Sequence, residues 1–223
     1  MVHILYSDGE LAVCLKPMGV LSEGQAPNAL PSLLEKELGR AVYPVHRLDR
    51  MTEGLMVFAL SPHAAAVLSR AIAEGKMKKE YLAVVCGAPA EASGSLRDLL
   101  FYDRRAGKTY VVDRSRKGVK EALLDYECLE VGDKHSLLRI MLHTGRTHQI
   151  RAQFASRSLP LVGDRRYGAP AEGQPMALFS HRLSFAHPKT GESMCFCHFP
   201  EPLDGTAWAE FAFFSDRENV GNL

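Results

Sequence analysis

Short apolar runs separated by turn residues are the feature that most constrains the fold of this chain. Residues 4–6 and 11–15 are two such runs, and Asp8-Gly9 lies between them. An Asp-Gly dipeptide between two apolar runs is typical of a β-hairpin. Further strand-like runs cover residues 55–60, 79–85, 123–131, 136–142, 179–185 and 194–199. Strands outnumber helices, so the pattern predicts an α+β fold with a mainly antiparallel sheet.

Helices are expected where capping residues precede apolar sequence. Ser61 is a suitable N-cap, and Pro62 fits a first helical turn because its missing N–H would have no partner there. This helix is expected to run to Gly75. Another helix is expected over residues 29–38, closed by Gly39. Further helices are expected over residues 147–156 and 208–214, and residues 87–120 form the least regular stretch.

The composition excludes several classes of protein. The 223 residues include 27 Lys and Arg against 26 Asp and Glu, a balance that is ordinary for a globular protein. No apolar run reaches the ~18 residues of a transmembrane helix, and the first residues do not form a secretory signal. The five cysteines lie mostly in apolar runs, which is typical of free thiols in a reducing compartment. We therefore expect a cytoplasmic protein that does not enter a membrane and binds no metal.

The net charge of +1 conceals an uneven distribution of charge. Residues 103–120 contain seven Lys and Arg but only two Asp, with Tyr102 and Tyr110 nearby. Such a stretch suits a phosphate backbone with occasional base stacking, although a solvated polar hairpin is the alternative. The C-terminal part compensates for it with Glu201, Asp204, Glu210, Asp216 and Glu218 against Arg217. The low net charge is therefore no argument against a nucleic-acid partner.

A first polar motif, HRLDRMTEG at residues 46–54, directly precedes an apolar strand. Asp49 lies there among His46, Arg47 and Arg50, whose charges would lower the pKa of its carboxyl group. A carboxylate that stays ionised suits a nucleophile or a general base. The alternative is a surface aspartate paired with an arginine.

A second polar motif, residues 144–151, directly follows an apolar strand. Thr147 is a plausible N-cap for the helix that would carry Arg151, and His148 is expected to be a buried histidine with satisfied hydrogen bonds. The chain contains no HExxH, no GxxxxGK[ST] and no GxGxxG. Metalloprotease, P-loop and Rossmann functions therefore have no support.

These motifs occur in an order that resembles the RluA-type pseudouridine synthases over nearly the whole chain. HRLDRMTEG resembles the catalytic motif of that family, and LHTGRTHQIR at 142–151 resembles a later one. The other matching segments are Lys16-Pro17-x-Gly19, Lys79-x-Tyr81-x-Ala83-x-Val85, Gly163-Asp164-x-x-Tyr167-Gly168 and His181-x-Leu183-x-Phe185-x-His187-Pro188. Each match is modest alone, but together they identify the family.

The resemblance implies a mixed, largely antiparallel sheet with flanking helices and a central cleft for RNA. It also implies a reaction, the isomerisation of uridine to pseudouridine in RNA without cofactor or metal. By position in the motifs, Asp49 is the catalytic aspartate, Tyr81 stacks on the target base and Arg151 pairs with Asp49. The residues expected to bind substrate are Arg47, His46, Ile150, Arg146, Arg114, Arg116 and Lys117. Attack of Asp49 on the sugar and attack on the base ring both remain open.

One residue departs from the family pattern, and several properties stay open. Glu53 replaces the usual serine, and we expect it to turn away from Asp49 or to pair with an arginine.

The first motif lies close to residue 1, so we expect one catalytic domain over residues 1–223, without an N-terminal accessory RNA-binding domain. We expect a monomer that acts on ribosomal or transfer RNA. A non-catalytic RNA-binding or chaperone module on the same fold is the alternative.

Overall fold

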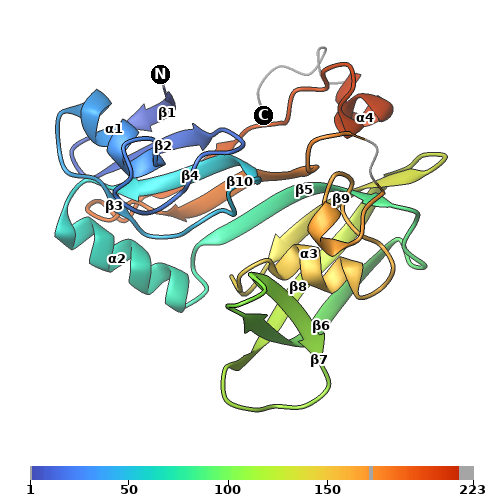
Figure 1. Cartoon of the computed structure of the whole chain (residues 1–223). Coiled ribbons are helices and arrows are strands. Elements are labelled where there is room, and N and C mark those ends of the chain that lie inside the picture. The colour runs from blue at the N-terminus through green and yellow to red at the C-terminus, as the bar shows by residue number, and fades with distance from the viewer. Residues whose placement is uncertain (1, 171–172, 216–223) are drawn as a thin grey trace. The chain divides into compact units, whose positions relative to one another are not determined.

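The computed structural model describes residues 2–170 and 173–215, which divide into two compact units. Unit 1 comprises the residues up to Glu80 together with Phe179–Phe199, and unit 2 comprises Tyr81–Leu178 and the described residues from Pro200 onward. Each unit is built mainly from antiparallel strands with a few helices (Figure 1), as the sequence predicted. No helix in these ranges is long and apolar enough to span a membrane. Asp216, Arg217 and Glu218 of the acidic C-terminal part lie outside the described residues.

The sheet of unit 1 begins with the predicted hairpin. Strands β1 (His3–Ser7) and β2 (Leu11–Lys16) pair antiparallel, and β2 pairs antiparallel with β4 (Glu53–Ala59). Strand β10 (Leu178–Ala186) then adds to β4 in parallel, which makes the sheet mixed. The short β3 (Tyr43–Pro44) pairs with β4, and β11 (Ser193–Cys197) pairs with β10.

Two helices of unit 1 follow the predicted signals. Helix α1 (Leu30–Leu38) ends at Gly39, whose φ of 66° is readily adopted by glycine. Helix α2 (Pro62–Ala73) begins at Ser61, whose Oγ accepts a hydrogen bond from the Ala64 N–H at 3.1 Å. The core between α2 and the sheet contains Leu11, Val13, Leu55, Val57, Ala59, Ala64, Leu68, Met77, Leu183 and Phe185.

The strands of unit 2 follow the order β5-β9-β8-β6-β7. Their bounds are β5 (Lys78–Cys86), β6 (Ser93–Asp103), β7 (Lys108–Val112), β8 (Val119–Val131) and β9 (His135–Leu142). The predicted pairing of residues 123–131 with 136–142 is confirmed, with a bulge between Cys128 and Glu130. The helices are α3 (Gln149–Ala155), η1 (Arg165–Tyr167), η2 (Ala207–Glu210) and α4 (Ala212–Ser215).

The structure corrects two of the sequence predictions for unit 2. Residues 87–120 are not irregular, because they contain the whole of β6 and of β7, which pair antiparallel with each other. In β6 only Leu96 and Leu100 are buried, so the strand lacks a strong apolar pattern. The final helix predicted over 208–214 is replaced by the short helices η2 and α4.

Candidate functional site

A buried lysine anchors the loop that carries Asp49 in unit 1. Lys16 is 1% exposed, and its Nζ donates hydrogen bonds to the carbonyls of Pro17, Val20 and Arg50 at 2.8, 2.9 and 3.0 Å. The three hydrogens of an ammonium group match these three acceptors. Burial lowers the pKa of Lys16 to about 8, so the group is charged at pH 7. The residue after Asp49 is thereby tied to the loop that follows β2.

Further hydrogen bonds fix the backbone on both sides of Asp49. Ser22 Oγ donates to the Leu48 carbonyl at 2.7 Å, and the Leu48 N–H donates back to Ser22 Oγ at 3.3 Å. The Thr52 N–H donates to the Asp49 carbonyl at 3.0 Å. The Asp49 side chain is partly exposed. The loop therefore presents one carboxylate from a backbone with little freedom to move.

Gly54, the last residue of the same motif, is required by close packing. Its φ is 111°, and a Cβ at this position would lie 2.4 Å from the carbonyl oxygen of Ser180. Gly54 also pairs with Ser180 where β4 and β10 run parallel. Any side chain here would push the two strands apart.

The His46 ring is hydrogen-bonded to the backbone of β4 and carries no charge at pH 7. Its Nε2 accepts a hydrogen bond from the Val57 N–H at 3.1 Å. Burial lowers the pKa of His46 to about 3, and the charge of Lys79 acts in the same direction. The prediction that His46 adds positive charge beside Asp49 is therefore wrong, because desolvation keeps the ring neutral.

Two charged neighbours of Asp49 contact the segment after β2. The exposed Arg47 forms an ion pair with Glu23. Glu53 Oε1 accepts a hydrogen bond from the Met18 N–H at 3.3 Å, so the structure gives this carboxylate a backbone partner.

In unit 2, the predicted residues Tyr81, Ile150 and Arg151 are all buried, Tyr81 on β5 and the other two on α3. Arg151 forms a bidentate ion pair with Asp164, at 2.6 Å for Nε–Oδ2 and 2.9 Å for Nη2–Oδ1. The guanidinium carbon lies 4.9 Å from the ring centroid of Tyr167, which is a cation–π contact. The predicted pairing of Arg151 with Asp49 involves the other unit and stays a prediction.

Sequence reasoning gave Asp164 and Tyr167 no role, although both belong to the matched segment at 163–168. The only hint in the sequence that these residues contact Arg151 was that an acid and an aromatic residue follow it within the matched motifs. A spacing of thirteen residues does not by itself indicate a contact, which is why the partners of Arg151 were missed.

The loop before α3 is organised by Gln149. Its Oε1 accepts hydrogen bonds from Thr144 Oγ1 at 2.7 Å and from the Arg146 N–H at 3.1 Å, and its Nε2 donates to the Leu123 carbonyl at 3.2 Å. Arg146 Nε donates to the Glu121 carbonyl at 2.9 Å. These bonds attach the motif to β8.

The start of α3 differs from the prediction. The residue before the helix is His148, in the left-handed conformation with φ 52° and ψ 28°, and Thr147 is not the N-cap. The Thr147 carbonyl instead accepts a hydrogen bond from Thr109 Oγ1 at 2.7 Å. This bond and the contacts of Gln149 direct the chain into the helix through His148.

The predicted RNA-binding residues Arg114, Arg116 and Lys117 lie together in the loop between β7 and β8. All three are exposed, and the guanidinium of Arg116 lies 4.8 Å from the ring centroid of Phe101. The structure thus presents these cations on one exposed loop, which is suited to contacts with phosphate groups.

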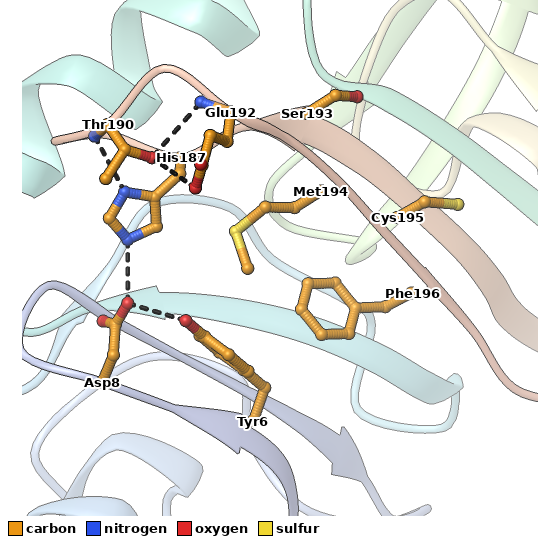
Figure 2. Close-up of a pocket in the computed structure, with 9 residues that line it drawn as sticks. All are labelled: Tyr6, Asp8, His187, Thr190, Glu192, Ser193, Met194, Cys195 and Phe196. Carbon is orange, nitrogen blue, oxygen red and sulfur yellow. Dashed lines mark hydrogen bonds and ion pairs between the residues drawn. The ribbon is translucent and has the colours of Figure 1, made fainter.

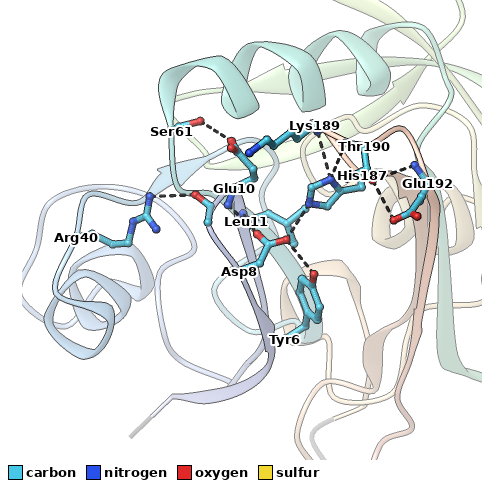
Figure 3. A network of polar contacts seen from close by, with 11 residues as sticks. Tyr6, Asp8, Glu10, Leu11, Arg40, Ser61, His187, Lys189, Thr190 and Glu192 are labelled. Atoms are coloured by element: carbon cyan, nitrogen blue, oxygen red, sulfur yellow. Dashed lines mark hydrogen bonds and ion pairs between the residues drawn. The ribbon is translucent and has the colours of Figure 1, made fainter.

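A separate cavity of about 430 Å³ lies in unit 1 and is lined by residues that include Tyr6, His187 and Phe196 (Figure 2). Asp8 Oδ2 accepts hydrogen bonds from Tyr6 Oη at 2.9 Å and from His187 Nε2 at 2.8 Å (Figure 3). Burial raises the pKa of Asp8, but hydrogen bonds from Glu10 and Leu11 outweigh it and bring the pKa to about 2. The network joins the β1–β2 turn to the turn after β10, which gives the His187-Pro188 segment a structural role.

Comparisons with known proteins agree with this arrangement. The family described as RNA pseudouridylate synthase matches residues 10–156. An uncharacterized RNA pseudouridine synthase of Aquifex aeolicus is 35% identical and covers 87% of this chain and 68% of its own length. The tRNA pseudouridine synthase C of Haemophilus influenzae is 30% identical, and the match covers 87% of this chain and 91% of that protein. The ribosomal large subunit pseudouridine synthase D of Vibrio cholerae is 34% identical, and the match covers 91% of this chain and 68% of that protein.

A solved structure shows the same fold. Human RNA pseudouridylate synthase domain containing 1 superposes with a TM-score of 0.74 at 26% identity, over 91% of this chain and 84% of that one. The fold and the sequence relatives therefore lead to one assignment. The chain belongs to the RluA-type RNA pseudouridine synthases and is an isomerase.

Proposed function

We propose that this enzyme converts a specific uridine of transfer or ribosomal RNA to pseudouridine, with Asp49 as the catalytic residue. The observation that carries the proposal is the fixed loop around Asp49, in which Lys16 and Ser22 bind the backbone on both sides. A rigid loop at the start of a buried strand is a suitable support for one reactive carboxylate. The relatives named for transfer RNA and for the large ribosomal subunit support both RNA classes.

The reaction breaks the bond between C1′ and N1 of the uridine and forms a bond between C1′ and C5. The proton on C5 is lost and N1 gains one, so the product is an isomer of the substrate. An ionised Asp49 supplies the nucleophile, whether it attacks the sugar or the base ring. The detached uracil has to stay bound while it turns, which requires a largely apolar pocket.

The other predicted residues serve this chemistry in distinct ways. Tyr81 offers an aromatic face to uracil, and one stacked base contributes about 1–3 kcal/mol. Ile150 provides an apolar wall. Arg151 keeps the Asp49 carboxylate ionised and directs it, and Asp164 in turn fixes the guanidinium.

Substrate contacts outside the pocket are assigned to the exposed cations. In this proposal Arg47 contacts the RNA near the flipped base, whose removal from the stack costs about a few kcal/mol. Arg114, Arg116 and Lys117 contact phosphates and help to offset this cost. Arg146 and His46 border the two motifs and shape their loops.

The test is release of tritium from RNA labelled at C5 of uridine, because only the isomerisation frees that hydrogen. Transfer RNA and ribosomal RNA transcripts are assayed separately, so the result also identifies the RNA class. Asp49→Asn should lower turnover by at least roughly 10³-fold. Asp133→Asn, an exposed aspartate in the β8–β9 turn, is the matched control. Wild-type turnover by Asp49→Asn would refute the assignment of Asp49, and RNA binding without tritium release by the wild type would favour a non-catalytic module.

A further inference from the structure

Three aromatic rings of unit 2 meet edge to face directly before Ile150 and Arg151. The ring centroid of His148 lies 6.1 Å from that of Tyr102 and 5.7 Å from that of Tyr167, with interplanar angles of 85° and 89°. The rings come from β6, from the loop before α3 and from η1. His148 is therefore one of the contacts between the β6–β7 hairpin and the segment that carries the proposed site residues, beside the bond from Thr109 to the Thr147 carbonyl.

His148 is held in an unusual conformation by specific bonds. Its φ of 52° is uncommon for a residue other than glycine, and such conformations cluster at functional sites. Tyr167 Oη accepts a hydrogen bond from the Thr109 N–H at 2.7 Å and lies 3.0 Å from His148 Nδ1. The hydrogen bond between Tyr167 Oη and His148 Nδ1 and the two ring contacts together orient the His148 ring.

Tyr102 remains exposed although it contacts His148. Tyr102 and Tyr110 are 40% and 43% exposed, yet they lie on opposite faces of the hairpin. The strand register pairs Tyr102 with Thr109 and Phe101 with Tyr110, and neighbouring side chains on a strand point to opposite faces. Tyr102 therefore shares the face on which Thr109 contacts the loop before α3.

The surroundings of Tyr102 are cationic. Arg104 and Arg105 follow it in the exposed turn, and Arg165 and Arg166 are exposed on η1. Arg166 Nη1 donates a hydrogen bond to the Gly107 carbonyl, so the two cationic segments lie side by side. An exposed aromatic ring beside several cations complements a nucleotide, which has a flat base and an anionic phosphate.

We propose that Tyr102, positioned by His148, stacks on a base of the RNA that neighbours the target uridine and so contributes to substrate selection. This inference rests on the proposed function, since it takes RNA as the substrate and Arg151 as part of the pocket. His148 precedes Arg151 by three residues at the start of α3, so a base stacked on Tyr102 would lie on the side of unit 2 where that helix begins. Tyr110 also has a cation beside it, with Lys108 Nζ 5.6 Å from its ring centroid, but it lies on the opposite face of the hairpin and is not expected to stack on this base.

The first experiment is photo-crosslinking, which does not depend on catalysis. A 12-nucleotide oligouridylate is irradiated with the full-length protein, and the tryptic peptides are analysed by mass spectrometry. Trypsin separates Tyr102, on residues 98–104, from Tyr110, on residues 109–114. We expect the RNA adduct on the 98–104 peptide. An adduct on 109–114 with none on 98–104 would overturn the inference.

The second experiment compares kinetics of matched variants on the tRNA and rRNA transcripts of the tritium assay. Tyr102→Ala should raise KM about 10-fold, in the range expected for one stacked base, while kcat stays within about twofold. Tyr102→Phe should restore the wild-type KM, because the phenyl ring still stacks. Tyr110→Ala is the control of the same residue type and similar exposure, and it should leave KM unchanged. An unchanged KM in Tyr102→Ala, or an equal rise in Tyr110→Ala, would contradict the proposal.

A third variant tests the positioning role of His148. Glycine adopts a φ of 52° without strain, so His148→Gly removes the ring while the backbone keeps its path. We expect KM to rise as in Tyr102→Ala, while thermal unfolding stays cooperative with a modestly lower midpoint, because the hydrogen bond to Tyr167 is lost. If KM stays at the wild-type value, His148 does not position Tyr102. If wild-type enzyme releases no tritium from any transcript, the proposed function fails, and the crosslink still decides whether Tyr102 binds RNA.

Discussion

Arg151 and Asp164 form an ion pair in which both side chains are nearly inaccessible to solvent, with exposed fractions of 8% and 2%. The pair is bidentate and uses Nε and Nη2 of the guanidinium, so it fixes the direction of the whole group. Removal of two charges from water is costly, and such pairs stabilise a fold less than their geometry suggests. The value of this pair therefore lies in the orientation of Arg151.

Asp164→Asn is expected to destabilise the protein and to impair catalysis. The change removes the carboxylate of the bidentate pair with Arg151, and the loss of one partner of a buried pair costs about 3–5 kcal/mol. Urea unfolding measures this loss, and tritium release should show a lower kcat. Glu121→Gln, which breaks the exposed pair with Arg97, is the control and should cost no more than about 1 kcal/mol.

A double variant separates stability from function. Arg151→Met combined with Asp164→Leu replaces both charges with apolar groups, and such replacements are often neutral or stabilising. We expect the free energy of unfolding to recover toward the wild-type value while turnover stays low. Recovery of turnover in the double variant would show that Arg151 has no role in the reaction.

Lys16 should give the protein a stability that depends on pH in the alkaline range. Burial lowers its pKa from 10.5 to about 8. Between these values the unfolded chain keeps the proton that the folded protein has released, so the free energy of unfolding rises with pH, by up to ~3 kcal/mol. Lys16→Met should lack this rise. Urea unfolding of both proteins at pH 7 and pH 9.5 measures the difference, and equal pH slopes would contradict the prediction.

The same variant should also affect turnover, since Lys16 binds the carbonyl of Arg50 next to Asp49. A small displacement of a reactive group lowers the rate by roughly 10- to 100-fold. Lys36→Met, on the exposed side of α1, is the control for loss of a lysine elsewhere in unit 1. Normal kcat in Lys16→Met would show that the loop keeps its conformation without the anchor.

Much of this fold could be predicted because local signals coincided with tertiary contacts. The Asp8-Gly9 turn, the Ser61 cap and the Gly39 stop each act within a few residues, and each occurs as expected. Strands β6 and β7 were missed for the opposite reason. Their pairing depends on partners in another strand, and their exposed positions carry charged residues that a single sequence reads as a loop.

The candidate site could be predicted only in part, because motifs identify residues but not their partners. The resemblance singled out Asp49 and Arg151 by their places in the chain. The contacts of Arg151 with Asp164 and Tyr167, and of Lys16 with Arg50, join segments that are separate in sequence. The charge of His46 was misjudged because burial, which lowers its pKa, cannot be read from neighbouring residues.

His46 should weaken the fold in acid. Its pKa is about 3 in the folded protein against 6.5 ordinarily, because burial opposes the charged ring. As the pH falls below 6.5 the unfolded chain binds a proton that the folded protein does not, so the free energy of unfolding decreases, by about 2 kcal/mol between pH 6.5 and pH 5. His46→Gln keeps an acceptor for the Val57 N–H but does not titrate, so this decrease should disappear. Urea unfolding at pH 5 and pH 7 tests this, with His63→Gln on the exposed side of α2 as control.

Removal of the charges of Arg114, Arg116 and Lys117 should weaken RNA binding in a way that depends on salt. Each phosphate contact contributes about 0.7–0.9 to the slope of log affinity against log salt concentration. Replacement of all three by Gln should make that slope shallower by roughly 2–3, as measured by filter binding to tRNA and rRNA transcripts between low and moderate salt. The matched control neutralises three exposed cations of unit 1, at Lys36, Arg70 and Lys76. An unchanged slope in the first triple variant would remove the β7–β8 loop from the RNA interface, and an equal change in the control would show that the effect reflects net charge and not contact.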